Sequence, residues 1–172
     1  TGGKNAEQIG LGIKIGSINT IQTQGAASTT GNSTDLMIQG EGFFTLTDGT
    51  NKFYTRAGAF SLDDTGNLVA ANGMMVCDSN GDPINLGTNP GNISIASNGT
   101  ISCTNSSDKK IGLTTFTNPA GLTKVGENIY TESPASGTID GGTATLTSPG
   151  ENSSGTIIAG SLEMSNVDLA QE

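Results

Sequence analysis

The chain has 172 residues and carries 16 acidic against 7 basic side chains, which gives a formal net charge of -9 at pH 7. Such a surface repels phosphate backbones and anionic headgroups, so composition argues against nucleic-acid partners and polybasic membrane binding. The sequence has no histidine, which excludes Ser-His-Asp and Cys-His catalysis and any metal site with histidine ligands.

The N-terminal region alternates apolar and small or polar residues. Ile9, Leu11, Ile13 and Ile15 occupy every second position, so an extended strand would place all four side chains on one face. Glycines lie between them and disfavour a helix. We therefore predict an extended β arm over residues 1–34.

A series of short strands and turns follows over residues 35–132. Gly40-Glu41-Gly42 predicts a bend between strands at 36–38 and 43–47, and Asp48-Gly49 predicts a hairpin turn into residues 52–56. Further strands are expected at 59–62, 68–70, 74–77, 83–86, 93–95 and 101–103, with turns at 63–67, Asn72-Gly73, Asn80-Gly81 and Asn98-Gly99. Turn signals about ten residues apart are typical of an all-β fold, here an antiparallel sandwich or a partly open barrel.

The C-terminal part contains predicted strands at 111–116, 128–130, 144–146 and 156–162. Residues 133–155 are rich in Gly, Ser, Thr and Pro, which indicates a long mobile loop or a loose hairpin. Residues 156–172 are expected to form a return strand and the start of a helix, because Ser165-Asn166-Val167-Asp168 fits a capping box. We expect helices to flank this core at both ends.

Several motifs have two interpretations. Asp78–Asp82 is either a calcium loop or a polar turn, and Asp63-Asp64 is either an acid–base pair or a solvated turn. Cys77 and Cys103 are either a disulfide across a sheet or two buried thiols. Arg56, the single arginine, either stacks on aromatic rings or pairs with an acidic residue, and we favour the pair.

Several ordered stretches resemble bacterial flagellar rod and hook axial proteins. They cover residues 35–44 (DLMIQGEGFF), 54–60 (YTRAGAF), 63–69 (DDTGNLV), 116–122, 126–130 and 160–169. We take the matching positions as structural, with no catalytic, cofactor or metal residue. They are Asp35, Gly40, Gly42, Phe43, Phe44, Tyr54, Thr55, Arg56, Gly58, Phe60, Gly66, Leu68, Asn118, Gly121, Leu122, Tyr130, Ser165, Asn166 and Val167.

These positions also suggest how the core is held together. We expect Phe43, Phe44, Phe60 and Leu68 to form one cluster. Glycines at 40, 42, 58 and 66 are expected to permit bends.

The resemblance implies a β core carried on terminal helices that line a tube. It further implies a non-enzymatic structural subunit of the flagellar basal body, exported across the cytoplasmic membrane, with neither a nucleic-acid partner nor direct membrane insertion. Its partners would be copies of itself and neighbouring rod and hook proteins, assembled around an export channel to transmit torque. About 45 residues separate Gly73 from Asn118, too few for the inserted domain of a hook protein, which favours the distal rod. The alternatives are a hook or proximal rod protein, or a secreted carbohydrate-binding β module centred on Tyr54 or Tyr130.

Overall fold

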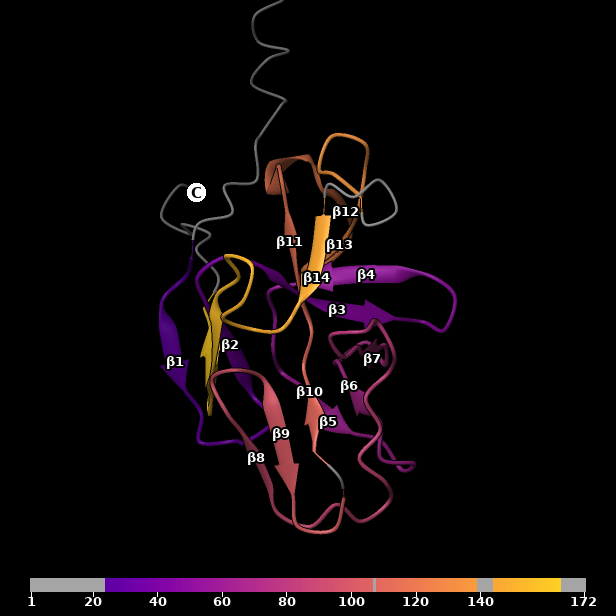
Figure 1. Cartoon of the computed structure of the whole chain (residues 1–172), viewed down its shortest axis with the longest axis vertical. Coiled ribbons are helices and arrows are strands. Elements are labelled where there is room, and N and C mark those ends of the chain that lie inside the picture. Colours follow the sequence, from indigo (N-terminus) through magenta and orange to yellow (C-terminus); the bar gives the residue numbers. More distant parts are fainter. Residues whose placement is uncertain (1–23, 107, 139–143, 165–172) are drawn as a thin grey trace, which may run out of the picture.

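The computed structural model describes residues 24–106, 108–138 and 144–164, and these form antiparallel sheets (Figure 1). Within these ranges the only helix is one short 3-10 turn, η1 (Pro119–Gly121). The predicted all-β fold is therefore confirmed. The predicted strand at 9–15 and the helix start at Ser165, Asn166 and Val167 lie outside the described residues.

The largest sheet holds nine strands. Seven run in the order β12 (Thr123–Gly126), β13 (Ile129–Thr131), β4 (Lys52–Thr55), β3 (Phe43–Thr47), β7 (Met75–Val76), β6 (Leu68–Val69) and β5 (Ser61–Leu62). Off this path, β11 (Leu113–Phe116) pairs with both β3 and β14 (Ala144–Thr147). Strand β3 thus contacts three partners and forms the centre of the fold.

Three smaller sheets surround this centre. One has the order β10 (Lys109–Lys110), β9 (Thr100–Cys103), β8 (Ile93–Ile95). The others are two-stranded and join β15 (Thr156–Ala159) to β2 (Leu36–Gln39) and β1 (Ala27–Thr29) to β16 (Ser161–Glu163). In Figure 1, β1 and β2 lie along one side of the molecule and the β8–β9 hairpin lies at its lower end.

The buried side chains form two clusters rather than the single one predicted. Phe44, Phe60 and Leu68 belong to the larger, mostly aliphatic cluster, and the Phe44 and Phe60 rings meet edge to face with centroids 4.9 Å apart. Phe43 belongs instead to a smaller, aromatic cluster. The reason is the strand period, because adjacent residues of β3 point to opposite faces of the sheet.

One five-residue hairpin turn occurs four times, at 63–67, 70–74, 78–82 and 96–100. In each, the first residue's N–H donates to the fifth residue's carbonyl at 2.8–3.0 Å, and the fourth residue's N–H donates back to the first residue's carbonyl at 2.9–3.1 Å. The fourth residue is always glycine, with φ between 83° and 92°. These glycine-turn hairpins confirm the turns predicted from Asn-Gly and from residues 63–67.

Some boundaries differ from the predictions. Residues 83–86 form isolated bridges, Cys77 with Pro83 and Asn67 with Asn85, rather than a strand. The predicted strand at 156–162 divides at Gly160, whose φ of 76° ends β15 before β16 begins. β14 lies where a strand was expected within 133–155, while the mobility of that segment stays a prediction.

Candidate functional site

The first and last described segments lie side by side. β1 pairs antiparallel with β16, with Ala27 opposite Glu163, and the Met164 N–H continues the ladder by donating to the Ala26 carbonyl at 2.8 Å. Gly25 also approaches Met164 so closely that a Cβ would overlap its carbonyl oxygen. The chain therefore enters and leaves the described core at one place, which we call the terminal junction.

Gln24 joins this junction to the end of β2. Its side-chain Nε2 donates to the Ile38 carbonyl at 3.0 Å, and its Oε1 accepts the Gly40 N–H at 3.1 Å. One amide thus bonds both a strand and the bend that follows it, so the entry point is fixed relative to the core.

Arg56 is the centre of the junction. Its Nη1 donates to the Gly40 and Gly42 carbonyls at 2.8 and 2.7 Å, and its Nη2 donates to the Ile38 carbonyl at 3.1 Å. The planar guanidinium suits this arrangement because its donors point in fixed, divergent directions. Arg56 therefore holds the Gly40–Gly42 bend in shape.

The acidic partner expected for Arg56 is Glu163 on β16. Glu163 Oε2 lies 2.9 Å from Nη2 and 3.2 Å from Nε, and Oε1 accepts the Gly25 N–H at 2.9 Å. The side chains are only 19% and 10% exposed, so solvent screens this pair less than a surface pair. The pair connects the bend after β2 to both chain ends.

The glycines of the bend are required by their conformation. Gly40 and Gly42 have φ of 114° and 120°, a region that residues with a side chain rarely adopt. A Cβ on Gly40 would also lie 2.9 Å from the Gly155 Cα, where the Gly155 N–H donates to the Glu41 carbonyl at 2.7 Å.

Gly66 and Gly58 differ in their roles. Gly66 has a φ of 87° and fits its predicted role in a bend. Gly58 has no such φ, although its carbonyl accepts the Phe60 N–H at 2.9 Å in a tight turn, so its role in a bend stays a prediction. Close packing requires glycine at this position, because a Cβ there would overlap the Leu36 carbonyl oxygen and lie 3.1 Å from the Phe44 ring.

Four rings form the core of the aromatic cluster: Phe43, Tyr54, Phe116 and Tyr130. Three pairs meet edge to face, with centroids 4.8 Å apart for Tyr54–Phe116, 5.8 Å for Phe43–Phe116 and 6.2 Å for Phe43–Tyr130. Leu122 packs against them. Tyr54 and Tyr130 are 0% and 9% exposed, so neither offers the open platform that a carbohydrate-binding module needs.

The other predicted positions have local roles. Asp35 is buried and bridges Ala59 across the sheet, and Thr55 Oγ1 accepts the Ala57 N–H at 3.0 Å. Asn118 Nδ2 donates to the Ala135 carbonyl at 3.0 Å, which ties η1 to residues 133–137.

Gly121 lies in the same contact. Its carbonyl accepts from Ser133 Oγ at 2.6 Å, and a Cβ on it would meet the backbone of Ala135 and Ser136 at 2.5–2.7 Å.

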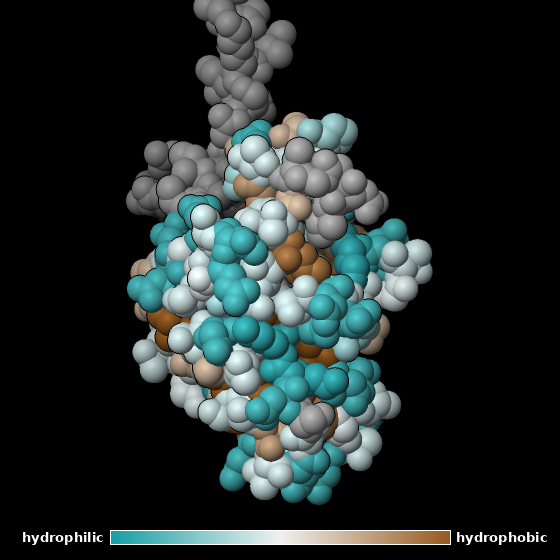
Figure 2. Space-filling model, in the orientation of Figure 1, coloured by the Kyte–Doolittle hydropathy of each residue, from teal (hydrophilic) through white to brown (hydrophobic). Residues whose placement is uncertain are grey.

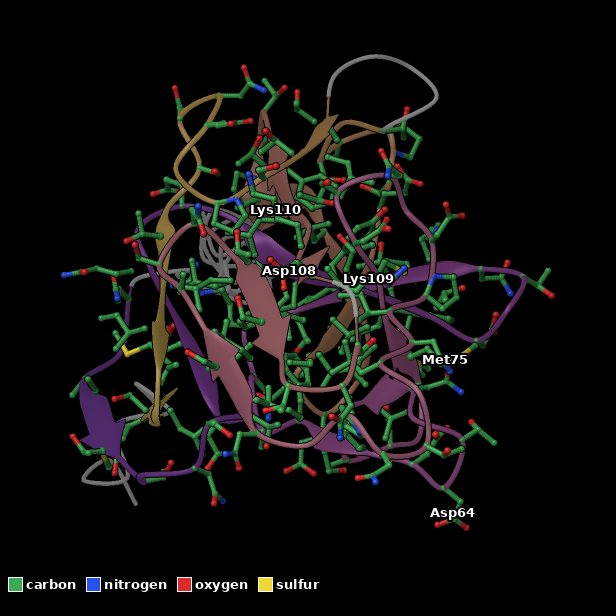
Figure 3. The ribbon with its side chains drawn as sticks, turned by 60° about the horizontal axis from the view of Figure 1, so that its bottom comes forward. Asp64, Met75, Asp108, Lys109 and Lys110 are labelled. Atoms are coloured by element: carbon green, nitrogen blue, oxygen red, sulfur yellow. The ribbon has the colours of Figure 1, made fainter. Side chains whose placement is uncertain are left out.

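The carboxylate of Asp63 is occupied by its own turn. Its Oδ1 accepts the N–H groups of Thr65 and Asn67 at 2.9 and 2.8 Å, and its Oδ2 accepts Asn67 Nδ2 at 3.0 Å. These hydrogen bonds, the Asn67 side chain first, lower the pKa of Asp63 from 3.8 to about 2. Asp64 points outward (Figure 3), so the two carboxylates form a turn and not an acid–base pair.

The cysteines are free thiols, Cys77 buried and Cys103 partly so. Burial raises the pKa of both, against an opposing effect of the neighbouring Lys52 ammonium at Cys77. Of the two interpretations of this pair, the structure therefore shows separate thiols. Asp78 likewise caps a turn through Oδ1, and within the described ranges no three acidic or thiol groups are placed to hold a metal.

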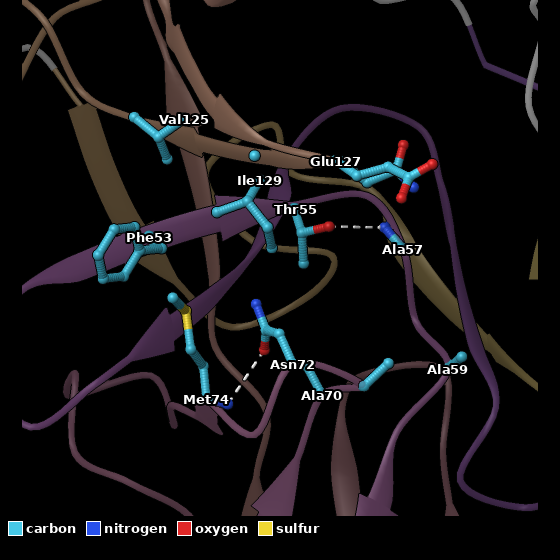
Figure 4. Close-up of a pocket in the computed structure, with 13 residues that line it drawn as sticks. Phe53, Thr55, Ala57, Ala59, Ala70, Asn72, Met74, Val125, Glu127 and Ile129 are labelled. Carbon is cyan, nitrogen blue, oxygen red and sulfur yellow. Dashed lines mark hydrogen bonds between the residues drawn. The ribbon is translucent and has the colours of Figure 1, made fainter.

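An open apolar groove lies between β4, the β6–β7 turn and the β12–β13 hairpin (Figure 4). It encloses about 590 Å³ and is lined by Phe53, Met74, Val125 and Ile129 among others. Val125, on the rim of this groove, is 52% exposed. The molecular face shown in Figure 2 is mostly hydrophilic, with small apolar spots. No helix in the described part of the chain is long and apolar enough to cross a bilayer.

Sequence reasoning missed two junction residues, Gln24 and Glu163. Glu163 stands inside the recognised stretch 160–169, but nothing in the sequence selects it from the 16 acidic residues as the partner of Arg56. The pairing depends on β1–β16 contact across more than 130 positions, which no local pattern signals.

The fold and the junction define an all-β core whose first and last described segments lie side by side, and comparison with known proteins shows what this core is similar to. Residues 37–103 match the family described as flagellar hook protein FlgE/F/G D1 domain. Flagellar basal-body rod protein FlgG of Bacillus subtilis is 43% identical over 176 residues, covering 99% of this chain and 65% of that protein. The FlgG of Buchnera aphidicola subsp. Acyrthosiphon pisum is 39% identical over 173 residues, covering 96% and 63%.

Similarity to a hook protein is narrower. Flagellar hook protein FlgE of Treponema pallidum is 57% identical over 76 residues, which is 44% of this chain and 16% of that protein. The chain is therefore similar to flagellar rod proteins over nearly its whole length and to hook proteins over less than half of it. It spans a little under two thirds of the length of the rod proteins that it matches.

Proposed function

We propose that this chain forms the β core of a structural subunit in the distal rod of the bacterial flagellar basal body. Similarity to proteins named flagellar basal-body rod protein runs over nearly the whole chain, whereas similarity to hook proteins covers less than half of it. The terminal junction carries the proposal, because it brings both ends of the core to one place from which two flanking segments can leave as a pair.

In this role the core is a rigid spacer and not a catalyst. Copies would meet head to tail through unlike surface patches, which produces an open helical array rather than a closed ring. Neighbouring axial proteins would continue the array around an export channel, and torque would pass between the flanking segments and the core through Arg56 and Glu163. The residues of the family motifs serve to keep this core stiff.

The same proposal assigns no enzyme activity, no nucleic-acid partner and no direct membrane insertion. The Asp63 carboxylate is occupied by turn hydrogen bonds, and burial raises the pKa of both thiols, which disfavours the nucleophilic thiolate. The protein would act in the basal body after export. The division into arm (1–34), core (35–132), mobile loop (133–155) and return segment (156–172) belongs to the proposal.

A hook subunit is the second candidate, favoured by the 57% identity to the T. pallidum hook protein over 76 residues. Isolated basal bodies from cells with an epitope tag on this protein separate the two. We expect antibody-bound gold on the rod, below the hook. Label confined to the hook would favour the second candidate, and absence of the protein from basal bodies would refute both.

A further inference from the structure

The four glycine-turn hairpins satisfy the N–H of their fifth residue in two different ways. At 63–67 and 78–82 the first residue is aspartate and accepts it, with Asn67 N to Asp63 Oδ1 at 2.8 Å and Asp82 N to Asp78 Oδ1 at 3.0 Å. In these two hairpins the aspartate side chain therefore caps the N–H of the fifth residue.

At 70–74 and 96–100 the first residue is alanine, which has no acceptor. There the third residue, an asparagine, takes over: Met74 N donates to Asn72 Oδ1 at 3.0 Å and Thr100 N donates to Asn98 Oδ1 at 3.1 Å. These two asparagine side chains are therefore anchored by their turns.

Asn80 occupies the same third position in the hairpin at 78–82 but is not anchored. Asp78 Oδ1 already accepts the N–H groups of Asp82 and Asn80, at 3.0 and 2.8 Å. The Asn80 side chain is exposed, and no described residue forms a hydrogen bond with its amide. The chain has three Asn-Gly pairs, and among them only Asn80 has a side chain that its turn leaves free to rotate.

We propose that Asn80 is a site of spontaneous deamidation, with water as the co-reactant. The backbone nitrogen of Gly81 loses its proton and attacks Cγ of Asn80, forming a C–N bond, and the side-chain nitrogen leaves as ammonia with that proton. Water then opens the resulting five-membered imide at either carbonyl, giving aspartate or isoaspartate. Glycine favours the attack because it has no Cβ to obstruct the nitrogen.

The hydrogen bond from the glycine N–H does not distinguish the three sites. Gly73, Gly81 and Gly99 all donate to the first residue of their turn, at 2.9, 3.0 and 2.9 Å. The three sites differ in the side-chain carbonyl of the asparagine. At Asn72 and Asn98 the Oδ1 atom must first give up its hydrogen bond to the N–H of the fifth residue before Cγ can be attacked. At Asn80 there is no such hydrogen bond to break.

The reaction would place a third carboxylate in a turn that already holds Asp78 and Asp82. Lys52 is the nearby cation, since its Nζ donates to the Gly81 carbonyl. Isoaspartate would also lengthen the backbone just before Ile84, which is buried in the core. The inference concerns the isolated fold and does not depend on the proposed function.

The test is peptide mapping by mass spectrometry of the whole chain after incubation at mildly alkaline pH. Asn80 is expected to convert at least about five times faster than Asn72 or Asn98, the factor that corresponds to one hydrogen bond of about 1 kcal/mol. In guanidinium the three rates should converge, because the hairpins are lost. Equal or faster conversion at Asn72 or Asn98 in the folded chain would overturn the proposal.

Reciprocal variants separate the cap from charge. Asp78→Ala should slow Asn80 by about five-fold, because its side chain can then cap the Asp82 N–H, whereas loss of a neighbouring negative charge alone would accelerate attack by the nitrogen anion. Asp78→Asn keeps an acceptor and should leave Asn80 fast.

The converse variant, Ala96→Asp, adds the first-residue acceptor at an exposed position and should accelerate Asn98. Circular dichroism confirms that each variant is folded. Acceleration of Asn80 in Asp78→Ala, or an unchanged Asn98 in Ala96→Asp, would contradict the mechanism.

Discussion

Replacing Arg56 with alanine should destabilise the core by about 3 kcal/mol, in the range measured when one partner of a buried ion pair is removed. The change deletes three hydrogen bonds to carbonyls and the pair with Glu163. It leaves the Glu163 carboxylate, 10% exposed, with the Gly25 N–H as the only other partner described for it. The Ile38 carbonyl keeps Gln24, so the loss concentrates on the bend and on Glu163.

Guanidinium unfolding followed by circular dichroism measures this loss. Arg56→Lys should recover only part of it, because an ammonium cannot reach all these acceptors in a fixed fork. Lys124→Ala, on the exposed strand β12, is the matched control and should stay within about 0.5 kcal/mol of the parent. A double-mutant cycle with Glu163→Ala should give a coupling energy above about 1 kcal/mol. A loss at Arg56→Ala no larger than the control's, or a coupling near zero, would refute the reasoning.

Three further changes test the rest of the fold. Gly58→Ala should cost more than about 2 kcal/mol because its Cβ overlaps backbone, whereas Gly73→Ala, with open space around it but a φ of 86°, should cost only about 1 kcal/mol; thermal melts compare them. Thr45→Val should cost about 1–3 kcal/mol by stranding the Thr114 hydroxyl 2.7 Å away, and Thr114→Val added to it should restore most of the loss in the same melts. The folded pKa of Asp63 is lowered from 3.8 to about 2, so the stability that this carboxylate contributes is present above pH 3.8 and is lost as pH falls toward 2. Asp63→Asn should lack this part of the acid dependence of the unfolding free energy. An acid profile unchanged by Asp63→Asn would contradict the lowered pKa.

The sequence specified the local structure well because its turns have strong chemical signals. Glycine fourth in each of the five-residue hairpins needs a positive φ, and either Asp in the first place or Asn in the third supplies the cap, so turn positions could be predicted. The Gly40–Gly42 bend was predicted for the same reason.

Long-range pairing could not be predicted in this way. β11 inserts between β3 and β14, and β1 joins β16, across separations that leave no periodic trace in the sequence. Short strands such as β10 and β12 were also not predicted, since two to four mostly polar residues show no alternation of apolar and polar side chains. Gly58 shows the remaining limit, because the close approach of another strand and not its own φ selects glycine there.

We propose above that this β core belongs to a rod subunit and that the terminal junction fixes the flanking segments to the core. A chimera tests it most directly, with the 172 residues replacing the matching segment of the B. subtilis rod protein, to which they are 43% identical, in a strain lacking that protein. Swimming in soft agar is expected to return with the chimera and to fail when the chimera carries Arg56→Ala. A chimera that is folded and exported but supports neither swimming nor rod assembly would contradict the account.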